Sequence, residues 1–310
     1  SFADKVFFCN SGTEAVESAI KLARKYFFDQ GQSGRTEIIT MHNSFHGRTL
    51  GSLSATAQKK FHTGFKPLLP GFKYIPFNDL QAARKAITKK TCAILVEPIQ
   101  GEGGVNVPDP SYLKGLKKLC QKNGALLIFD EVQSGFGRTG KLFAYELYKT
   151  KPDIMTMAKA LGGGVAIGAM AATNKAMKSF VPGTHAATFG GNPLACSAAL
   201  ATLKVITGKN FLNKVSATGN YFSQRLQEIA RKNPVVKEAR GAGLFLALEL
   251  NQPGHEIVVD CMNQGFLINC IQQNVLRFIP PLTISRKDID SLVSVLSNSL
   301  TKLNDKQQTF

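Results

Sequence analysis

Three short apolar runs, each interpreted as a strand, end in side chains that could carry acid–base or covalent chemistry. These side chains are Glu97, the pair Asp130 and Glu131, and Lys159. In open α/β sheets, ligands bind beyond the carboxyl ends of the strands. A carboxylate there is costly to bury unless a cation or a proton donor pairs with it. Each carboxylate could instead cap a neighbouring helix, and taken singly that structural role explains it equally well.

Lys159 follows the apolar run 153–157 and precedes Gly162–Gly164, which allow a close approach of the backbone. A lone lysine is usually solvated. However, an amine at the strand ends opposite Asp130 is the combination that Schiff-base chemistry with pyridoxal phosphate requires. The amine binds the aldehyde carbon, and the carboxylate keeps the pyridine nitrogen protonated so that the ring takes up electrons. Together the two residues favour a pyridoxal-phosphate site.

The segment Asn10–Ala15 lies between the first expected strand and the first expected helix, at 13–28. Backbone N–H groups at a helix start suit a dianionic phosphate, and the hydroxyls of Ser11 and Thr13 can also donate. An ordinary helix cap explains the same residue types. The presence of Lys159 is what favours a phosphate cradle.

Two glycine motifs are interpreted as chance matches. Gly135–Gly140 fits the pattern G-x-G-x-x-G, but Glu131–Ser134 separate it from the strand, and no acidic residue follows at the distance of a dinucleotide site. With Lys141 the segment also nearly matches a P-loop. Leu142 then stands where magnesium chemistry needs serine or threonine.

Composition favours a soluble, cytoplasmic protein. The chain has 310 residues, 44% of them hydrophobic, and a net charge of +17. Its lysines and arginines are spread along the chain, which favours a solvated basic surface over a nucleic-acid interface. No apolar run is long enough to cross a membrane. The scattered cysteines and histidines favour free thiols and no metal site. Because the chain starts at Ser1 and enters a strand at once, we expect a preceding segment to be missing.

Strands and helices alternate over the first two-thirds of the chain, which predicts an α/β fold with a mostly parallel sheet covered on both faces. Residues 1–205 are expected to form this large domain, and residues 206–310 a smaller α+β domain. The small domain should contain a helix at 209–232 and a last helix that starts near Ser285. Strands are expected there at 243–250, 265–269 and 276–279.

Six segments, taken together and in order, closely resemble the class III, or ornithine-type, aminotransferases. The segments are Ser11–Ala15, Ser44–Thr49, Glu97–Gly104, Phe129–Gln133, Ala158–Ala160 and Thr188–Pro193. The resemblance runs over essentially the whole chain. It implies a fold type I transferase that depends on pyridoxal phosphate.

The resemblance also implies roles for the residues that would hold the cofactor. Gly12 and Thr13 would bind its phosphate, Phe45 would stack on the pyridine ring, and Val132 would pack on the opposite face. Gln133 would hydrogen-bond the phenolic oxygen.

Two further residues would act in catalysis. Asp130 would pair with the ring nitrogen, and Lys159 would bond the cofactor and carry the proton. Thr188 resembles the threonine that reaches the cofactor phosphate of a neighbouring subunit, which implies a homodimer with shared active sites.

On the substrate side, Arg48 resembles the family arginine that binds the α-carboxylate of an ornithine-like donor. Arg277 resembles the arginine that binds the α-carboxylate of 2-oxoglutarate. Glu102 would pair with Arg277 while the donor is bound and then release it. Ala187 stands where relatives often have a serine that contacts the substrate.

Thr13, His46 and Gly103–Gly104 most resemble the family members that use N2-acetylornithine. That implies transfer of its δ-amino group to 2-oxoglutarate, giving N-acetylglutamate 5-semialdehyde and glutamate in arginine biosynthesis. Ornithine, succinylornithine, 4-aminobutyrate or a diamine are alternative donors on the same fold. A non-catalytic basic binding protein is the remaining alternative.

Overall fold

The structure is a computed structural model that describes residues 1–308, with side chains described through Asn304. Internal contacts divide the chain into two compact units. The first consists of residues 1–101, 108–136 and 143–207. The second consists of residues 102–107, 137–142 and 208 onward. Two short segments from the first half of the chain therefore belong to the same unit as the C-terminal region.

The first unit is built on a seven-stranded sheet with the strand order β1-β7-β6-β5-β4-β2-β3. Neighbours from β3 to β6 pair in parallel, whereas β7 is antiparallel to β6 and to β1. The strands are β1 (Lys5–Cys9), β2 (Glu37–Met41), β3 (Phe72–Ile75), β4 (Thr91–Val96), β5 (Leu126–Asp130), β6 (Ile154–Met157) and β7 (Gly168–Ala172). Every residue of β4 and β5 is buried, as expected for central strands with both faces covered.

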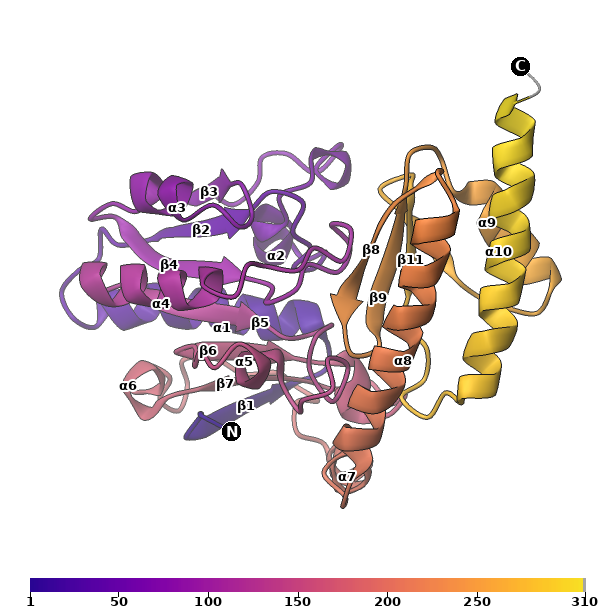
Figure 1. The fold of residues 1–310 in the computed structure, drawn as a ribbon. Helices are drawn as coiled ribbons and strands as arrows, with labels where there is room; N and C mark the ends of the chain where they lie inside the picture. The colour runs from indigo at the N-terminus through magenta and orange to yellow at the C-terminus, as the bar shows by residue number, and fades with distance from the viewer. Residues whose placement is uncertain (309–310) are drawn as a thin grey trace. The chain divides into compact units, whose positions relative to one another are not determined.

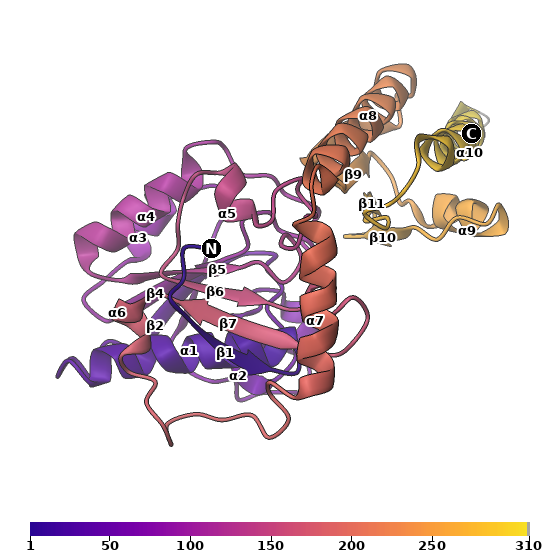
Figure 2. The same ribbon diagram turned by 90° about the horizontal axis from the view of Figure 1, so that it is seen from below.

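Helices cover both faces of this sheet. Helix α1 lies on one face, and α3 and α4 lie on the other (Figure 2). The helices of the unit are α1 (Gly12–Phe28), α2 (Leu50–Ala55), α3 (Leu80–Ala86), α4 (Tyr112–Asn123), α5 (Ala144–Leu147), α6 (Asn174–Met177) and α7 (Pro193–Ile206), with 3-10 turns η1 (Lys59–Phe61) and η2 (Lys159–Gly162). The buried face of α1 packs with residues of β2, β4, β5, β6 and β7 in one hydrophobic core.

The second unit has a four-stranded antiparallel sheet with the order β10-β11-β9-β8. Its strands are β8 (Val236–Ala242), β9 (Phe245–Leu250), β10 (Asn269–Ile271) and β11 (Val275–Phe278). Helices α8 (Phe211–Lys232), α9 (His255–Asn263) and α10 (Arg286–Gln308) share a separate core with this sheet (Figure 1). Ser285 and Asp288 form the capping box at the start of α10.

These elements confirm the predicted α/β class and most of the predicted strands. One prediction is wrong: residues 265–268 form no strand, and β10 begins only at Asn269. Gly265 has a φ of 83°, which is a turn conformation and not the extended backbone of a strand. Strands β3 and β8 were not predicted.

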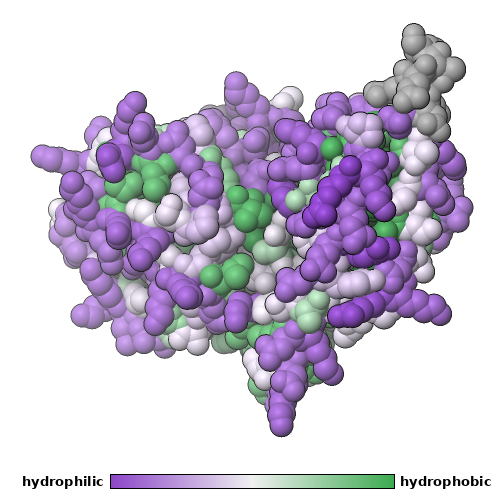
Figure 3. All heavy atoms as spheres, viewed as in Figure 1, coloured by the Kyte–Doolittle hydropathy of each residue, from purple (hydrophilic) through white to green (hydrophobic). Residues whose placement is uncertain are grey.

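The face of the molecule seen in Figure 3 is largely hydrophilic. Figure 3 shows hydrophilic side chains distributed over the viewed face, with small apolar groups between them. Within the part of the chain that the structure describes, no helix combines the length and the apolar character needed to span a membrane.

Candidate active site

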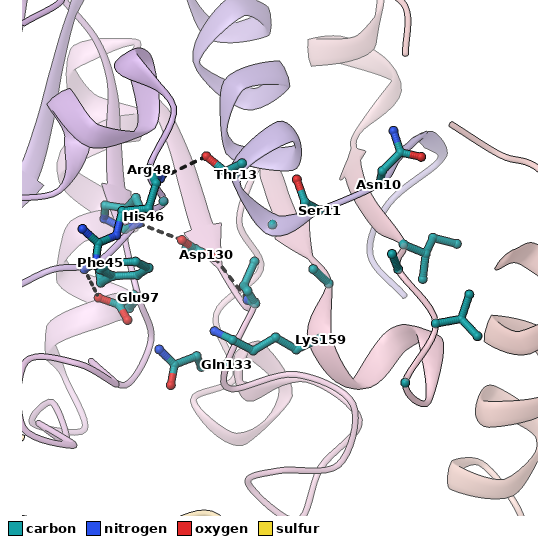
Figure 4. A pocket seen from close by; sticks show the side chains of 18 residues that line it. Asn10, Ser11, Thr13, Phe45, His46, Arg48, Glu97, Asp130, Gln133 and Lys159 are labelled. Atoms are coloured by element: carbon teal, nitrogen blue, oxygen red, sulfur yellow. Dashed lines mark hydrogen bonds and ion pairs between the residues drawn. The ribbon is translucent and has the colours of Figure 1, made fainter. Parts of the chain in front are cut away.

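The first unit contains a cavity of about 500 Å³ at the carboxyl ends of β4, β5 and β6, next to the start of α1 (Figure 4). Eight of the residues expected at the site line this cavity: Gly12, Thr13, Phe45, Arg48, Asp130, Val132, Gln133 and Lys159. They come from four separate regions of the chain. The parallel sheet brings them together because the carboxyl ends of its strands share one edge.

Asp130 is the last residue of β5, and its carboxylate is almost completely buried. Thr156 on the neighbouring strand donates its hydroxyl to Oδ1 at 2.9 Å, and the Val132 N–H donates to the same oxygen at 3.1 Å. His46 Nδ1 lies 2.7 Å from Oδ2. These three contacts fix the orientation of the carboxylate at the cavity wall.

His46 was not predicted as a site residue, although it lies beside Phe45 in one of the family motifs. Its ring is buried. Among the described residues, no hydrogen-bond partner is found for its Nε2 atom. A buried histidine that is held on one nitrogen by a cavity carboxylate is a signal that only the folded chain provides.

Glu97 lines the same cavity and is fully buried. Its carboxylate accepts the N–H groups of Phe45 and Gly101, each at 3.1 Å. Burial raises the pKa of Glu97 to about 7; His46 lowers it and Asp130 raises it by smaller amounts. Glu97 therefore holds the backbone of the loop that presents Phe45.

The raised pKa predicts a pH dependence of stability. A carboxyl whose folded-state pKa lies above its unfolded value of 4.5 contributes stability that is fully present below pH 4.5 and is lost as the pH rises through about 7. Glu97→Gln cannot ionise. Between pH 4.5 and 8, its free energy of unfolding should therefore gain roughly 3 kcal/mol relative to wild type. Denaturant unfolding at the two pH values measures this, and parallel pH profiles would contradict it.

Glu131, by contrast, does not line this cavity. It accepts the N–H groups of Ala144 and Tyr145 and the hydroxyl of Ser134, at 2.7 to 2.9 Å. Burial raises the pKa of Glu131 to about 7 as well. For this carboxylate the helix-capping interpretation holds, because two of its three partners, Ala144 and Tyr145, lie at the start of α5.

Lys159 begins η2 two residues after the end of β6, and its side chain extends into the cavity on the side where Gln133 and Asp130 lie (Figure 4). Its φ is 45°, in the left-handed region that side chains other than glycine rarely adopt. Such strain is often retained at functional sites, where the surrounding structure enforces it. Here it turns the chain at the strand end so that the amine enters the cavity.

The start of α1 faces the same cavity. Ser11 caps the helix by accepting the N–H of Glu14, and the first N–H groups of a helix have no partner within it. A Cβ atom added at Gly12 would lie 3.0 Å from a methyl of Val132. Glycine at this position therefore lets the start of α1 lie close to Val132 without crowding it.

This set of residues fits pyridoxal phosphate. The α1 N-terminus provides amide donors for a phosphate. Phe45 and Val132 are the apolar side chains that could cover the faces of a ring, while Asp130 and Lys159 offer the carboxylate and the amine.

Arg48 is exposed at the rim of the cavity, and its guanidinium lies 4.1 Å from the ring centre of Phe61 and 5.4 Å from that of Phe45. Among the residues that the structure describes, no carboxylate forms an ion pair with Arg48. A guanidinium stacked on aromatic rings keeps its N–H donors available for a carboxylate. Phe61, which the sequence analysis did not single out, is thus part of this site.

The second unit contains Arg277 and Glu102, which form an ion pair at 2.7 Å. Arg277 lies on β11, is buried, and also donates to Asn269 at 3.3 Å. Ala187 and Thr188, in the first unit, line a different pocket from the one that contains Lys159.

Comparison with known proteins identifies the family. A model of the class-III aminotransferases matches residues 1–300. An acetylornithine aminotransferase of Methanocaldococcus jannaschii is 52% identical over 301 residues, which cover 97% of this chain and 75% of that protein. The acetylornithine aminotransferase of Caldanaerobacter subterraneus is 51% identical over 305 residues, covering 98% of this chain and 77% of that protein.

Solved structures agree. The ornithine aminotransferase of Toxoplasma gondii superimposes with a TM-score of 0.94 at 36% identity, covering 98% of this chain and 74% of that one. A second structure of that enzyme has pyridoxal phosphate at partial occupancy in its active site. These likenesses confirm the predicted fold and the predicted cofactor.

Proposed function

Because this chain belongs to the class-III aminotransferases, which use pyridoxal phosphate, we propose that its amino donor is N2-acetylornithine. The δ-amino group would pass to 2-oxoglutarate, giving N-acetylglutamate 5-semialdehyde and glutamate in arginine biosynthesis. The observation that carries the proposal is that Lys159 and Asp130 meet in one cavity at the start of α1. The relatives named acetylornithine aminotransferase, which are 51% and 52% identical in sequence to this chain, support the choice of donor.

The residues of the cavity have distinct roles in this proposal. Gly12 and Thr13 would hold the phosphate, and Phe45 and Val132 would hold the ring between them. Gln133 would donate to the phenolic oxygen. When bound, the cofactor supplies an aldehyde that takes the amino group and a ring that accepts electrons.

Proton transfer is assigned to two side chains. The carboxylate of Asp130 would hold a proton on the ring nitrogen. Lys159 would hold the cofactor covalently before the donor arrives. Its Nζ, once released, would take up and return a proton beside the donor carbon, as a positioned general base and acid does.

Two arginines would recognise carboxylates of the substrates. Arg48 binds the α-carboxylate of the donor through its free guanidinium donors. Arg277 binds the α-carboxylate of 2-oxoglutarate after Glu102 releases it. The ion pair between Arg277 and Glu102 supports the first state of this exchange, in which the donor is bound.

Half-reaction rates test the donor. The spectral change of the bound cofactor should be fastest with N2-acetylornithine and slower with ornithine or 4-aminobutyrate, all at equal concentration. A faster reaction with ornithine would assign the chain to that donor instead and overturn the proposal.

Arg48→Ala tests the carboxylate site. Loss of a charge-assisted contact should raise the KM for N2-acetylornithine by roughly 10- to 100-fold, corresponding to about 1.5–3 kcal/mol. The KM for a plain diamine, which has no carboxylate, should change by less than twofold. Steady-state kinetics with both donors give the comparison, and equal losses would remove Arg48 from the substrate site.

A homodimer with shared active sites is part of the proposal. An apolar surface on and before α7 supports it, because Phe189, Leu194, Leu200 and Val205 are each more than half exposed. Apolar surfaces of this kind commonly mark protein interfaces. Thr188 adjoins this surface and would reach the partner's cofactor phosphate. Sedimentation at micromolar concentration should show a dimer, and a stable, active monomer would contradict it.

We also place the enzyme in the cytoplasm. All six cysteines are free thiols, which suits a reducing compartment.

A further inference from the structure

A cluster of hydroxyl groups joins α1 to the loop that carries Arg48. The hydroxyl of Thr13 lies 2.8 Å from that of Thr49 and also contacts the hydroxyl of Ser52. The backbone N–H groups of Arg48 and Thr49 both donate to Thr13 Oγ1, each at 3.2 Å. A single side chain of α1 therefore fixes the backbone on both sides of the Arg48 carbonyl.

Glu17 anchors this cluster from the next turn of α1. Its Oε1 atom accepts the hydroxyl of Thr49 and, at 3.0 Å, the N–H of Ser52. Residues four apart on a helix lie on the same face, which places Glu17 beside Thr13. The N–H of Ser52 belongs to the first turn of α2, where amides have no partner within the helix. Glu17 is thus the carboxylate that holds the far end of the Arg48 loop.

Two glycines allow the loop to approach α1 this closely. A Cβ atom at Gly47, whose φ is 132°, would lie 2.4 Å from Thr13 Oγ1. A Cβ atom at Gly51 would lie 2.3 Å from Glu17 Oε2. The loop is therefore docked on α1 at two points, one on each side of Arg48.

We propose that Glu17 is a positioning residue for donor recognition, which holds the 47–52 loop so that the Arg48 guanidinium stays over Phe61 at the cavity rim. The inference rests on the proposed role of Arg48 in binding the donor carboxylate. Without the anchor, the loop would have to be ordered when the donor binds, and that ordering weakens affinity. The chemical step, which occurs at Lys159, would be unaffected.

Glu17→Ala removes both acceptor contacts. The KM for N2-acetylornithine should rise about tenfold while kcat stays within twofold of wild type. The dissociation constant of valerate, a monocarboxylate without an amine, should rise by a similar factor in calorimetry of the holoenzyme. Glu17→Gln keeps one acceptor oxygen. Both of its constants should therefore lie between those of wild type and those of Glu17→Ala. Asp29→Asn, which removes a charge from the other end of α1, is the matched control and should leave both constants unchanged.

Gly51→Ala separates positioning from general stability. The added methyl would displace the Glu17 carboxylate, yet alanine favours a helix more than glycine does. The KM should therefore rise as in Glu17→Ala without a fall in Tm. An unchanged KM, or a rise that only accompanies a lower Tm, would overturn the inference.

A double-mutant cycle with Arg48→Ala tests whether Glu17 acts through Arg48. In the Arg48→Ala background, Glu17→Ala should raise the KM no further, whereas additive effects would refute the coupling. If Arg48→Ala raises the KM and Glu17→Ala alone does not, the positioning role fails and the proposed function stands. If Arg48→Ala leaves the KM unchanged, both the carboxylate site and the inference are overturned.

Discussion

Replacing Lys159 with alanine is expected to lower kcat by roughly 10⁴-fold, the upper end of what a positioned acid–base group contributes. The variant loses both the covalent hold on the cofactor and the amine that carries the proton. Reduction of wild type with borohydride, followed by peptide mass spectrometry, should find the cofactor on the peptide that contains Lys159. Added methylamine should restore part of the activity of the variant, since it replaces the missing base.

Lys151→Ala is the matched control for this experiment. Lys151 precedes the same strand, β6, but is exposed and does not line the cavity of Lys159. Its turnover should equal that of wild type. Cofactor attached to another lysine, or an active Lys159→Ala enzyme without added amine, would contradict the assignment on which the proposed function depends.

The catalytic edge of the sheet could be predicted because its signals are local. Strands β4, β5 and β6 are short apolar runs, and each has a polar residue at or just beyond its carboxyl end: Glu97 follows β4, Asp130 ends β5, and Lys159 lies two residues beyond β6. Parallel topology then requires these residues to share an edge. Asp130 and Lys159 could therefore be identified as site residues from the sequence alone.

The edge strands β3 and β8 gave no such signal. Strand β3 has the sequence Phe-Lys-Tyr-Ile, in which Lys73 pairs with Glu37 of the neighbouring strand. Strand β8 contains Lys237 and Arg240, which both pair with Glu249 on β9. Their stability comes from contacts with partners elsewhere in the chain, so an apolar pattern within the strand is weak or missing.

The supporting residues of the site escaped prediction for the same reason. His46 and Asp130 are 84 positions apart, and Glu17 and Thr49 are 32 apart. In the sequence alone, nothing distinguishes His46 or Glu17 from an ordinary core or surface residue. Only the fold shows that His46 contacts Asp130 and that Glu17 contacts the segment next to Arg48.

The strongest test of the electron-accepting chemistry is Asp130→Asn. The amide has nearly the same shape, so the contacts with Thr156 and Val132 can be kept on its oxygen. It carries no negative charge, however, and cannot hold a proton on the ring nitrogen. We expect the cofactor still to bind and kcat to fall by roughly 10²–10³-fold, as when one preorganised electrostatic group is removed from an active site.

Glu131→Gln provides the contrast, because Glu131 is the next residue and equally buried but holds the start of α5. That variant should lose stability, measured as a lower Tm, and keep its kcat. Asp130→Asn should show the reverse, with a large loss of kcat. Asp130, the last residue of β5, faces the cavity, whereas Glu131, the next residue, contacts the start of α5. The two variants therefore separate an effect on the reaction from an effect on folding. Turnover of Asp130→Asn within threefold of wild type would remove the aspartate from the reaction.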